Sequence, residues 1–209
     1  RNSRKEHKGH KDGRSWIARV WKFVTLEPCL GCLDNWNVWN VSSLIFGDIS
    51  VLVEQDNEQL KDQVRAYWNA HPCGTQFTHL EWGSKEFFEE VERFRYETQP
   101  FMREVMEFDR HKGERLLEIG CGLGTDLMQF ARGGALVTGV DLTPASAELV
   151  RRRLALYGLS GNAQVADAER LPFADNTFDV VYSFGVLHHT PNTAKSVDEA
   201  YRVLRPGGR

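Results

Sequence analysis

The chain has 209 residues, of which 41% are apolar and 26% are charged, and its formal net charge is −3 at pH 7. This composition excludes global disorder, and the length is sufficient for one large domain or for one domain with an appendage. The small negative charge argues against a dedicated nucleic-acid binder, and no apolar run reaches the 18 uncharged residues of a membrane span.

Residues 1–56 follow no regular pattern, so we leave this segment unassigned and expect it to be partly disordered. Residues 1–14 carry a net charge of +4, which is typical of a solvated tail, with RNA or a membrane surface as the alternative contact. A short apolar helical face follows, which would suit a surface or membrane-interface helix unless the segment lies outside the natural domain. This face comprises Trp16, Ile17, Val20, Trp21 and Val24.

Two cysteines near the start, Cys29 and Cys32, have the CxxC spacing that zinc sites and redox-active dithiols use. A zinc site needs a second pair of ligands, and the nearest candidates, His71 and Cys73, do not have zinc spacing. We therefore predict no metal and leave the role of the pair open. No secretory signal pattern precedes the cysteines, so we expect free thiols in a reducing cytoplasm.

Regular helical signals begin at residue 57 and predict a helix to about residue 70, ended by the proline and glycine of segment 71–74. Ser84 would cap a second helix, and Pro100 would begin a third. We expect residues 57–112 to form a helical cap. The spacing of the first helix is carried by Leu60, Val64, Tyr67 and Trp68, and the third would carry Phe101, Met102, Val105 and Met106.

From residue 113 onward strands alternate with helices, which predicts an α/β fold with a doubly wound, mainly parallel sheet. The expected strands span 115–119, 135–140, 163–166 and 178–183. One helix should span 125–132, and another should begin at Thr143 with Pro144 in its first position and end at Gly158. A last helix would open at Thr193 or Ser196, with a capping box over 196–199, and would bury Val197, Ala200, Tyr201 and Leu204.

The most informative segment is 116–126, where a strand runs into three alternating glycines, Gly120, Gly122 and Gly124, that open a helix. Glycines permit a tight turn and let a ligand approach the backbone closely. The free N–H groups at such a helix start attract an anionic group of a ligand. Dinucleotide enzymes share this pattern, but their GxGxxG fingerprint needs a glycine at position 125, which is threonine here.

Acidic residues end the next two predicted strands. Asp141 could accept both hydroxyls of a ribose, and the alternative, a cap for the next helix, is weakened because Thr143 and Pro144 already supply that start signal. Asp167 lies where an adenine amino group could be read, although alone it would more often be a turn residue. Three such strand-end features in this order indicate a nucleotide-like ligand.

With these motifs, residues 115–209 resemble a class I S-adenosylmethionine-dependent methyltransferase. The first motif matches 117–124, the second matches Val140 and Asp141, and the third matches Asp167 and Ala168 followed by 171–173. Segments 178–183 and 204–208 match the fourth strand and the turn before the fifth. Within the family, the small-molecule branch with the quinone-biosynthesis C-methyltransferases is most similar, because it carries a similar segment at 187–189.

The resemblance implies S-adenosyl-L-methionine as cofactor, with Glu118 and the backbone of the glycine turn holding its methionine end. Asp141 would hold the ribose, Leu142 would flank the adenine, Asp167 would accept from the adenine amine, and Phe184 with Gly185 would border the sulfonium. The implied cofactor-binding residues are Glu118, Gly120, Cys121, Gly122, Gly124, Asp141, Leu142, Asp167, Ala168 and Phe184.

A general base is needed only if the methyl acceptor loses a proton, and His188 is the candidate, with a purely structural role for the histidine pair as the alternative. Tyr67, Trp68 and His189 are candidates to contact the acceptor, and Tyr96 is a further aromatic candidate. The alternative for the aromatic residues is that they are ordinary core residues.

The predicted function is therefore methyl transfer to a small molecule by in-line displacement, in the cytoplasm, with no nucleic-acid partner. An NAD(P)-binding oxidoreductase and a non-catalytic nucleotide-binding fragment remain as alternatives. In this family the complete sheet has seven strands in the order 3-2-1-4-5-7-6, so we expect 113–209 to be a Rossmann-like domain that is incomplete at its C-terminus. The missing initial methionine and the end after 206–208 fit a fragment with an unpaired fourth strand, low solubility and little activity.

Overall fold

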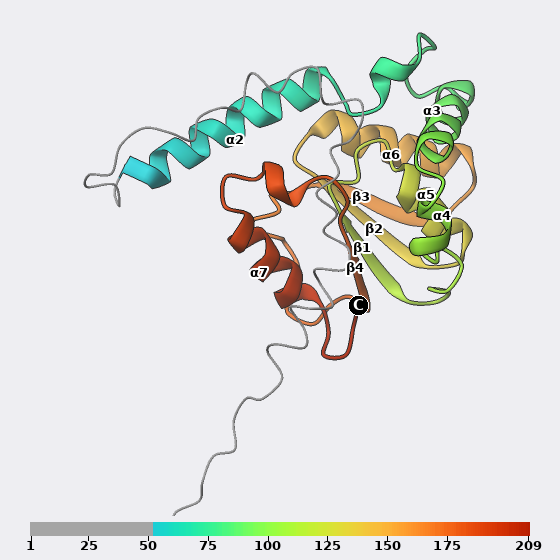
Figure 1. Ribbon diagram of the computed structural model, residues 1–209. Coiled ribbons are helices and arrows are strands. Elements are labelled where there is room, and N and C mark those ends of the chain that lie inside the picture. Colours follow the sequence, from blue (N-terminus) through green and yellow to red (C-terminus); the bar gives the residue numbers. More distant parts are fainter. Residues whose placement is uncertain (1–51) are drawn as a thin grey trace, which may run out of the picture.

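The computed structural model describes residues 52–209, with side chains from residue 57 (Figure 1). The expectations for the basic start, the tryptophan-rich face and the pair Cys29 and Cys32 lie outside the described residues. The helices are α2 (Leu52–Ala70), α3 (Lys85–Thr98), α4 (Met102–Val105), α5 (Thr125–Arg132), α6 (Pro144–Leu156) and α7 (Thr193–Val203), with 3₁₀ turns η2 (Thr75–Phe77) and η3 (Leu187–His189). The strands are β1 (Arg115–Ile119), β2 (Leu136–Asp141), β3 (Gly161–Val165) and β4 (Val180–Tyr182).

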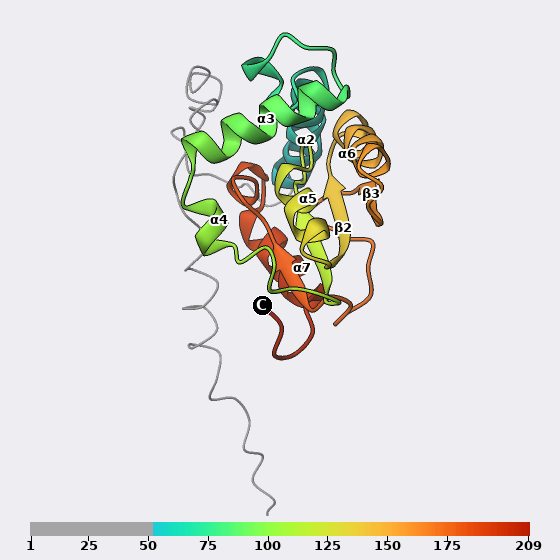
Figure 2. The same cartoon turned by 90° about the vertical axis from the view of Figure 1, so that its right-hand side faces the viewer.

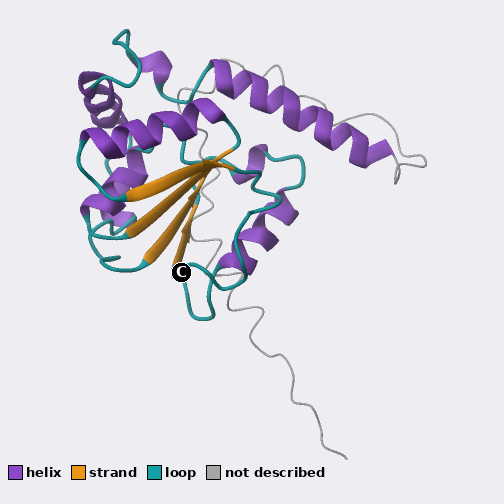
Figure 3. Cartoon of the chain, turned by 180° about the vertical axis from the view of Figure 1, so that it is seen from behind, coloured by secondary structure: helices purple, strands orange, loops and turns teal. Residues whose placement is uncertain are grey.

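The four strands form one parallel sheet in the order β3-β2-β1-β4. Helices α5 and α6 lie against one face of the sheet and α7 lies on the other (Figures 1 and 3). Leu116 and Leu117, neighbours in β1, are both fully buried, but they belong to separate apolar clusters on the two faces. Helices on both faces of a parallel sheet confirm the predicted doubly wound α/β fold, in which an interior strand such as β1 is buried on both faces.

Local capping signals set the starts of two helices as predicted. Ser84 Oγ accepts a hydrogen bond from Phe87 N at 3.1 Å, and Thr143 Oγ1 accepts one from Ser146 N at 3.3 Å. Each interaction satisfies an N–H group that has no partner within the first helical turn. Strand β1 and helix α5 also have the predicted bounds.

Helix α7 begins at Thr193, one of the two predicted starts, but Ser196 lies inside the helix, so the predicted capping box over 196–199 is wrong. Asn192 is the capping residue, and its side chain accepts from Lys195 N at 3.0 Å. Ser196 is fully buried instead, and its hydroxyl donates to Thr190 Oγ1 at 3.0 Å. The predicted burial of Tyr201 is also wrong, because its side chain is 57% exposed.

The outer edge of β4 is partly paired, which corrects the expectation that it would be open. Val181 N donates to Arg209 O at 2.8 Å, and Arg209 N donates to Asp179 O at 3.1 Å. Phe178, predicted inside the strand, forms a parallel bridge with Leu204 instead. The segment after α7 thus returns alongside β4 and covers part of its edge.

Helices α2 and α3 lie at the end of the molecule toward which the strand arrows point (Figure 2). Helix α3 is tied to the sheet layer by Arg153 of α6, which is fully buried and bridges Leu123 O at 3.1 Å and Glu92 Oε2 at 2.7 Å. Asn69 of α2 accepts from Ala145 N, at the start of α6, at 3.2 Å. Across the described helices, none combines the length and apolar character needed to cross a membrane.

Candidate functional site

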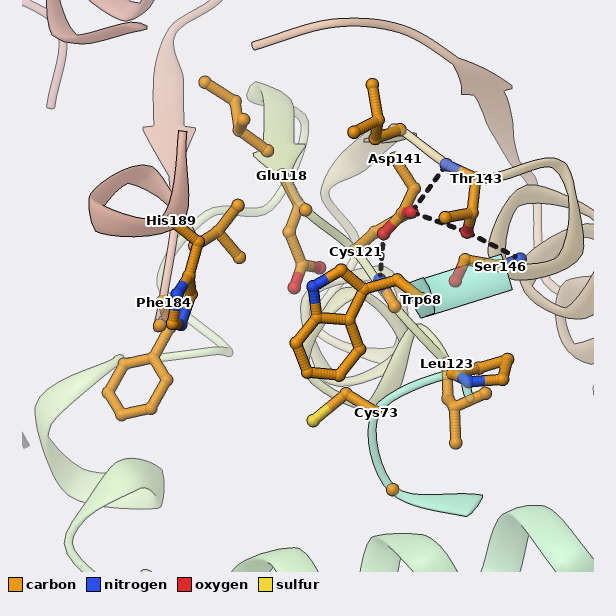
Figure 4. Close-up of a pocket in the computed structure, with 18 of the residues that line it drawn as sticks. Trp68, Cys73, Glu118, Cys121, Leu123, Asp141, Thr143, Ser146, Phe184 and His189 are labelled. Carbon is orange, nitrogen blue, oxygen red and sulfur yellow. Dashed lines mark hydrogen bonds between the residues drawn. The ribbon is translucent and has the colours of Figure 1, made fainter. Parts of the chain in front are cut away.

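A cavity of about 240 Å³ opens at the carboxyl ends of the strands, beneath α2 and α3 (Figure 4). Its floor comes from the loops that follow β1, β2, β3 and β4. Because the loop after β1 leads to α5 on one face and the loop after β4 leads to α7 on the other, the cavity lies at the switch point of the sheet. Ligands bind at this position in open α/β sheets.

The glycine turn closes onto β2 through its own amide groups. Gly120 N and Cys121 N both donate to Val140 O, at 2.8 and 3.0 Å, and Gly122 N donates to Asp141 Oδ2 at 3.0 Å. The turn therefore gives a ligand space and close approach, while these three N–H groups already have protein partners.

Each glycine of the turn has a positive φ, but the three have different surroundings. A Cβ at Gly120 would collide with the side chain of Val186, whereas nothing lies within 4 Å of the equivalent position at Gly122. Gly124 does not line the cavity; it is the capping residue of α5, and a Cβ there would contact Val150 at 3.0 Å. The role of Gly124 is therefore helix entry and close packing.

Asp141 lies on the cavity wall at the end of β2. Besides Gly122 N, its carboxylate accepts from Thr143 N at 2.9 Å and from Thr143 Oγ1 at 2.8 Å. The helix-entry role considered as an alternative is thus present together with exposure to the cavity. These bonds fix the orientation of both oxygens, as the dashed lines in Figure 4 show.

Glu118 has the most unusual environment in the cavity. Glu118 is only 5% exposed, and its Oε2 atom has no hydrogen-bond partner among the described residues. Burial, and secondarily the charge of Asp126, raises the pKa of this carboxyl group well above its usual value. Figure 4 shows the carboxylate in the middle of the pocket, between Trp68 and His189.

A polar network beside Glu118 was missed by the sequence analysis. Asp126 Oδ2 accepts from Arg95 Nη2 at 2.7 Å and from Tyr182 OH at 2.9 Å, and Asp126 Oδ1 accepts from Tyr96 OH at 2.9 Å. Arg95 and Asp126 line the cavity, whereas the candidate Tyr96 does not, since its hydroxyl points to Asp126. The sequence did contain a signal for this network. Arg95 lies on the same face of α3 as the apolar residues Phe88 and Val91, and a charged residue on a buried face needs a partner.

A second network, also missed, lies on the opposite side of the cavity. Lys61 of α2 is 5% exposed, and its Nζ contacts Asp167 Oδ2 at 2.7 Å, Glu169 Oε2 at 2.9 Å and Glu58 Oε1 at 3.1 Å. Burial alone would lower the pKa of Lys61, but hydrogen bonds from its ammonium to Asp167 and Glu169 raise it above the usual range. Lys61 shares a helical face with Val64 and Trp68, which is the same signal as that of Arg95.

Helix α2 and the loop after β4 place some, but not all, of the predicted acceptor residues at the cavity. Trp68 and His189 line it, with ring centroids 6.5 Å apart. Tyr67 is 39% exposed and packs its ring against His71, 5.0 Å away between centroids, and it does not line the cavity. His188 does not line it either, and burial lowers the pKa of its imidazole.

The remaining predicted positions, Leu142, Ala168, Phe184 and Gly185, all line the cavity. An apolar wall that was not predicted from the sequence comes from η2 and α3. There Phe77 and Phe94 stack with ring centroids 3.9 Å apart, and Val91 lies on the same wall. The described residues hold no group of three or more side chains able to bind a metal ion.

Residues 117–209 match a protein family described as a methyltransferase domain. Over 95 residues the chain is 41% identical to a sterol 4-C-methyltransferase of Caenorhabditis elegans. The aligned segment covers 44% of this chain and 28% of that protein. Over 102 residues it is 43% identical to a demethylmenaquinone methyltransferase of Clavibacter sepedonicus. This alignment covers 46% of this chain and 39% of that protein. The chain thus spans less than half the length of these curated relatives.

Among solved structures, the PH0226 protein of Pyrococcus horikoshii OT3 superposes with a TM-score of 0.50 at 27% identity, over 68% of this chain and 62% of that one. The named relatives give no support to the oxidoreductase alternative. The domain match covers all four strands of the sheet apart from the first two residues of β1. By this match and by its fold, residues 117–209 are similar to a methyltransferase domain.

Proposed function

We propose that the cavity binds S-adenosyl-L-methionine and that the protein transfers its methyl group to a small-molecule acceptor. The observation that carries this proposal is the buried Glu118 carboxylate, which has an oxygen without a partner and lies beside a glycine turn that leaves room for a ligand. A buried carboxylate oxygen without a donor is unfavourable, and a cationic ligand group would satisfy it. The cofactor carries such a group, the ammonium of its methionine end.

The other proposed contacts follow the order of the strands across the cavity. Asp141, at the end of β2, would accept from the ribose hydroxyls with the lone pairs that its backbone contacts leave unused. Leu142 and Ala168 would flank the adenine, and Asp167, at the end of β3, would accept from its amine. Because each oxygen of Asp167 already accepts one hydrogen bond, the adenine would share this carboxylate with the protein.

When bound, the cofactor supplies a methyl group that an acceptor atom can attack in line with the carbon–sulfur bond. The protein contributes orientation and exclusion of water, and well-aligned attack is worth roughly 7–11 kcal/mol relative to free encounter. Phe184 would border the reacting centre from the loop after β4. Where the acceptor must lose a proton, His189 would take it, since His189 and not His188 lines the cavity.

The apolar wall of Phe77, Val91 and Phe94 would face the acceptor. We accordingly propose that residues 57–112 serve as a cap that shapes the acceptor side and that residues 113–209 bind the cofactor. A cytoplasmic location is consistent with the free thiol of Cys121.

A titration of the 209-residue chain with S-adenosylmethionine and, separately, with NADH tests the cofactor. We expect heat of binding with the first ligand and none with the second, and tighter binding of NADH would overturn the proposal. Asp141→Ala should weaken binding of S-adenosylmethionine at least tenfold, while Asp141→Asn, which keeps an oxygen for Thr143, separates ligand contact from helix entry. Asp175→Ala, a surface carboxylate that contacts Arg202 outside the cavity lining, is the matched control.

A screen with labelled methyl donor and candidate metabolites then tests the transfer itself. Incorporation of label into a small molecule, abolished by Asp141→Ala and kept by Asp175→Ala, would support the proposed reaction. Cofactor binding without incorporation into any acceptor would favour a binding module instead.

A further inference from the structure

We propose that the side-chain oxygen of Gln99 recognises the methyl acceptor, and that the acceptor is an uncharged, largely apolar molecule with a hydroxyl or N–H group that donates to this oxygen. The inference rests on the proposed function, because it names the acceptor class for the same cavity. Gln99 follows the last residue of the cap helix α3 and lies outside the strand-end motifs.

Gln99 combines a hydrogen-bonded backbone with an unsatisfied side chain. Its N–H donates to Arg95 O at 3.0 Å, and its carbonyl accepts from Met102 N at 3.1 Å. The residue lines the cavity and is only 7% exposed, yet its Oε1 atom is buried without a hydrogen-bond partner among the described residues. An amide oxygen only accepts hydrogen bonds, so a ligand group that donates one would satisfy it.

The position of Gln99 favours the acceptor side of the cavity. The contacts proposed for the cofactor come from the sheet and from the loops that follow its strands. Gln99 instead follows the helix that supplies Val91 and Phe94 to the apolar wall. It comes five residues after Phe94, which corresponds to about 7.5 Å along a helix. A molecule the size of two fused rings, packed along this wall, would therefore reach the amide.

The other polar groups that α3 brings to the cavity are already engaged. The hydroxyl of Thr98 donates to Phe94 O at 2.7 Å, within its own helix. Arg95 pairs with Asp126 at 2.7 Å, so these two residues together present no net charge. The wall thus offers a ligand apolar surface and one neutral acceptor atom, which favours an uncharged molecule with a donor group over a charged one.

The Gln99 oxygen makes no hydrogen bond to the part of the chain that the structure describes, and this separates a recognition role from a structural one. Removing a buried oxygen that lacks a partner also removes the cost of burying it. Gln99→Leu should therefore leave the urea midpoint of unfolding unchanged or raise it.

The test measures two probes by calorimetry on the 209-residue chain saturated with S-adenosylhomocysteine, the demethylated cofactor, which fills the cofactor side and has no methyl group to transfer. The probes are 2-naphthol and 2-methoxynaphthalene, two apolar molecules of which only the first has a hydrogen to donate. The unmodified chain should bind 2-naphthol about fivefold more tightly, the effect of one neutral hydrogen bond. Gln99→Leu should reduce this preference to less than about twofold by weakening 2-naphthol alone.

The matched control is Gln129→Leu, the same substitution at a buried glutamine of α5. Gln129 is 9% exposed and does not line the cavity. This variant should keep the preference for 2-naphthol, and both variants should bind S-adenosylhomocysteine as the unmodified chain does.

Three results would overturn the inference and leave the proposed function intact: a preference that survives Gln99→Leu, no preference in the unmodified chain, or no binding of either probe to the chain loaded with S-adenosylhomocysteine. An equal loss of affinity for both probes, together with a lower urea midpoint, would assign Gln99 to the fold and overturn it as well. If S-adenosylhomocysteine did not bind, the proposed function would fail first, and this inference with it.

Discussion

Lys61 Nζ and Asp167 Oδ2 lie 2.7 Å apart, although 106 residues separate them in the chain. The contact joins α2 to a residue in the loop directly after β3, which lines the cavity. Glu169, whose side chain is only 3% exposed, contacts the same ammonium at 2.9 Å. One lysine of the cap helix therefore neutralises two carboxylates of the sheet layer, and it orients Asp167 toward the cavity.

Lys61→Met should destabilise the fold by about 3 kcal/mol, because it leaves the carboxylate of Glu169 buried without its cation. Urea unfolding followed by circular dichroism measures this change. The matched control is Arg65→Met on the same helix, whose ion pair with Asp62 is exposed and should cost less than about 0.5 kcal/mol. Equal effects of the two substitutions would contradict the assignment of Lys61 as a buried anchor.

Gly120→Ala should destabilise the chain by about 3 kcal/mol, since an alanine there adopts an unfavourable positive φ and also collides with Val186. Gly185→Ala has a similar φ of +70° but open space around the added methyl group, so it should cost only about 1 kcal/mol. Thermal or urea unfolding of both variants provides the measurement. The double substitution Gly120→Ala/Val186→Ala should recover part of the lost free energy of unfolding. If it recovered none, the collision with Val186 would not be the cause of the loss.

Asn192→Ala should lower the free energy of unfolding by about 1 kcal/mol, the usual cost of losing a helix cap. The reason is that the Asn192 side chain accepts the hydrogen bond from Lys195 N at the start of α7. Thr193→Ala, at the exposed first position of the same helix, should change stability by less than about 0.5 kcal/mol. If Thr193→Ala proved the more costly substitution, the cap assignment would be wrong.

The contribution of Glu118 to the stability of the ligand-free chain should fall as the pH rises above 4.5. The pKa of Glu118 in the folded state is raised above the usual 4.5 by burial and by the charge of Asp126, so the unfolded chain loses this proton first. The contribution of Glu118 is fully present below pH 4.5 and is lost as the pH rises through the folded-state pKa. Urea unfolding at a series of pH values measures the slope.

Glu118→Gln is the matching variant for this pH dependence. It has no proton to lose, so its stability should decline less than that of the unmodified chain over the same range of pH. Parallel stability curves for the two proteins would show that Glu118 does not titrate differently in the folded and unfolded states.

Local signals in the sequence predicted much of the sheet domain. The apolar run 115–119 predicted a strand, and Ser84 and Thr143 marked helix starts that the structure shows at those residues. Such features depend on the period of apolar residues and on side chains that bond their own backbone, so neighbouring residues suffice to read them. The glycine turn was readable for the same reason.

Prediction was incomplete where several local candidates competed. Thr193 and Ser196 were both possible first residues of the last helix; the helix begins at Thr193 with Asn192 as its cap, and Ser196 is buried against Thr190. The short length of β4 depended on Leu204, which pairs with Phe178 only after the chain has turned back behind α7. Neither choice is visible in a window of neighbouring residues.

The sequence by itself determined the order of strands and helices, the glycine turn and the acidic residues at the strand ends, because each of these is a local pattern. Only the tertiary structure decided which distant charges meet: Lys61 with Asp167 and Glu169, and Arg95 with Asp126 beside Glu118. A charged residue on an apolar helix face indicates that the fold must supply a partner of opposite charge, but it does not identify that partner. The partner is fixed by how α2 and α3 pack over the sheet, which depends on contacts summed over the whole chain.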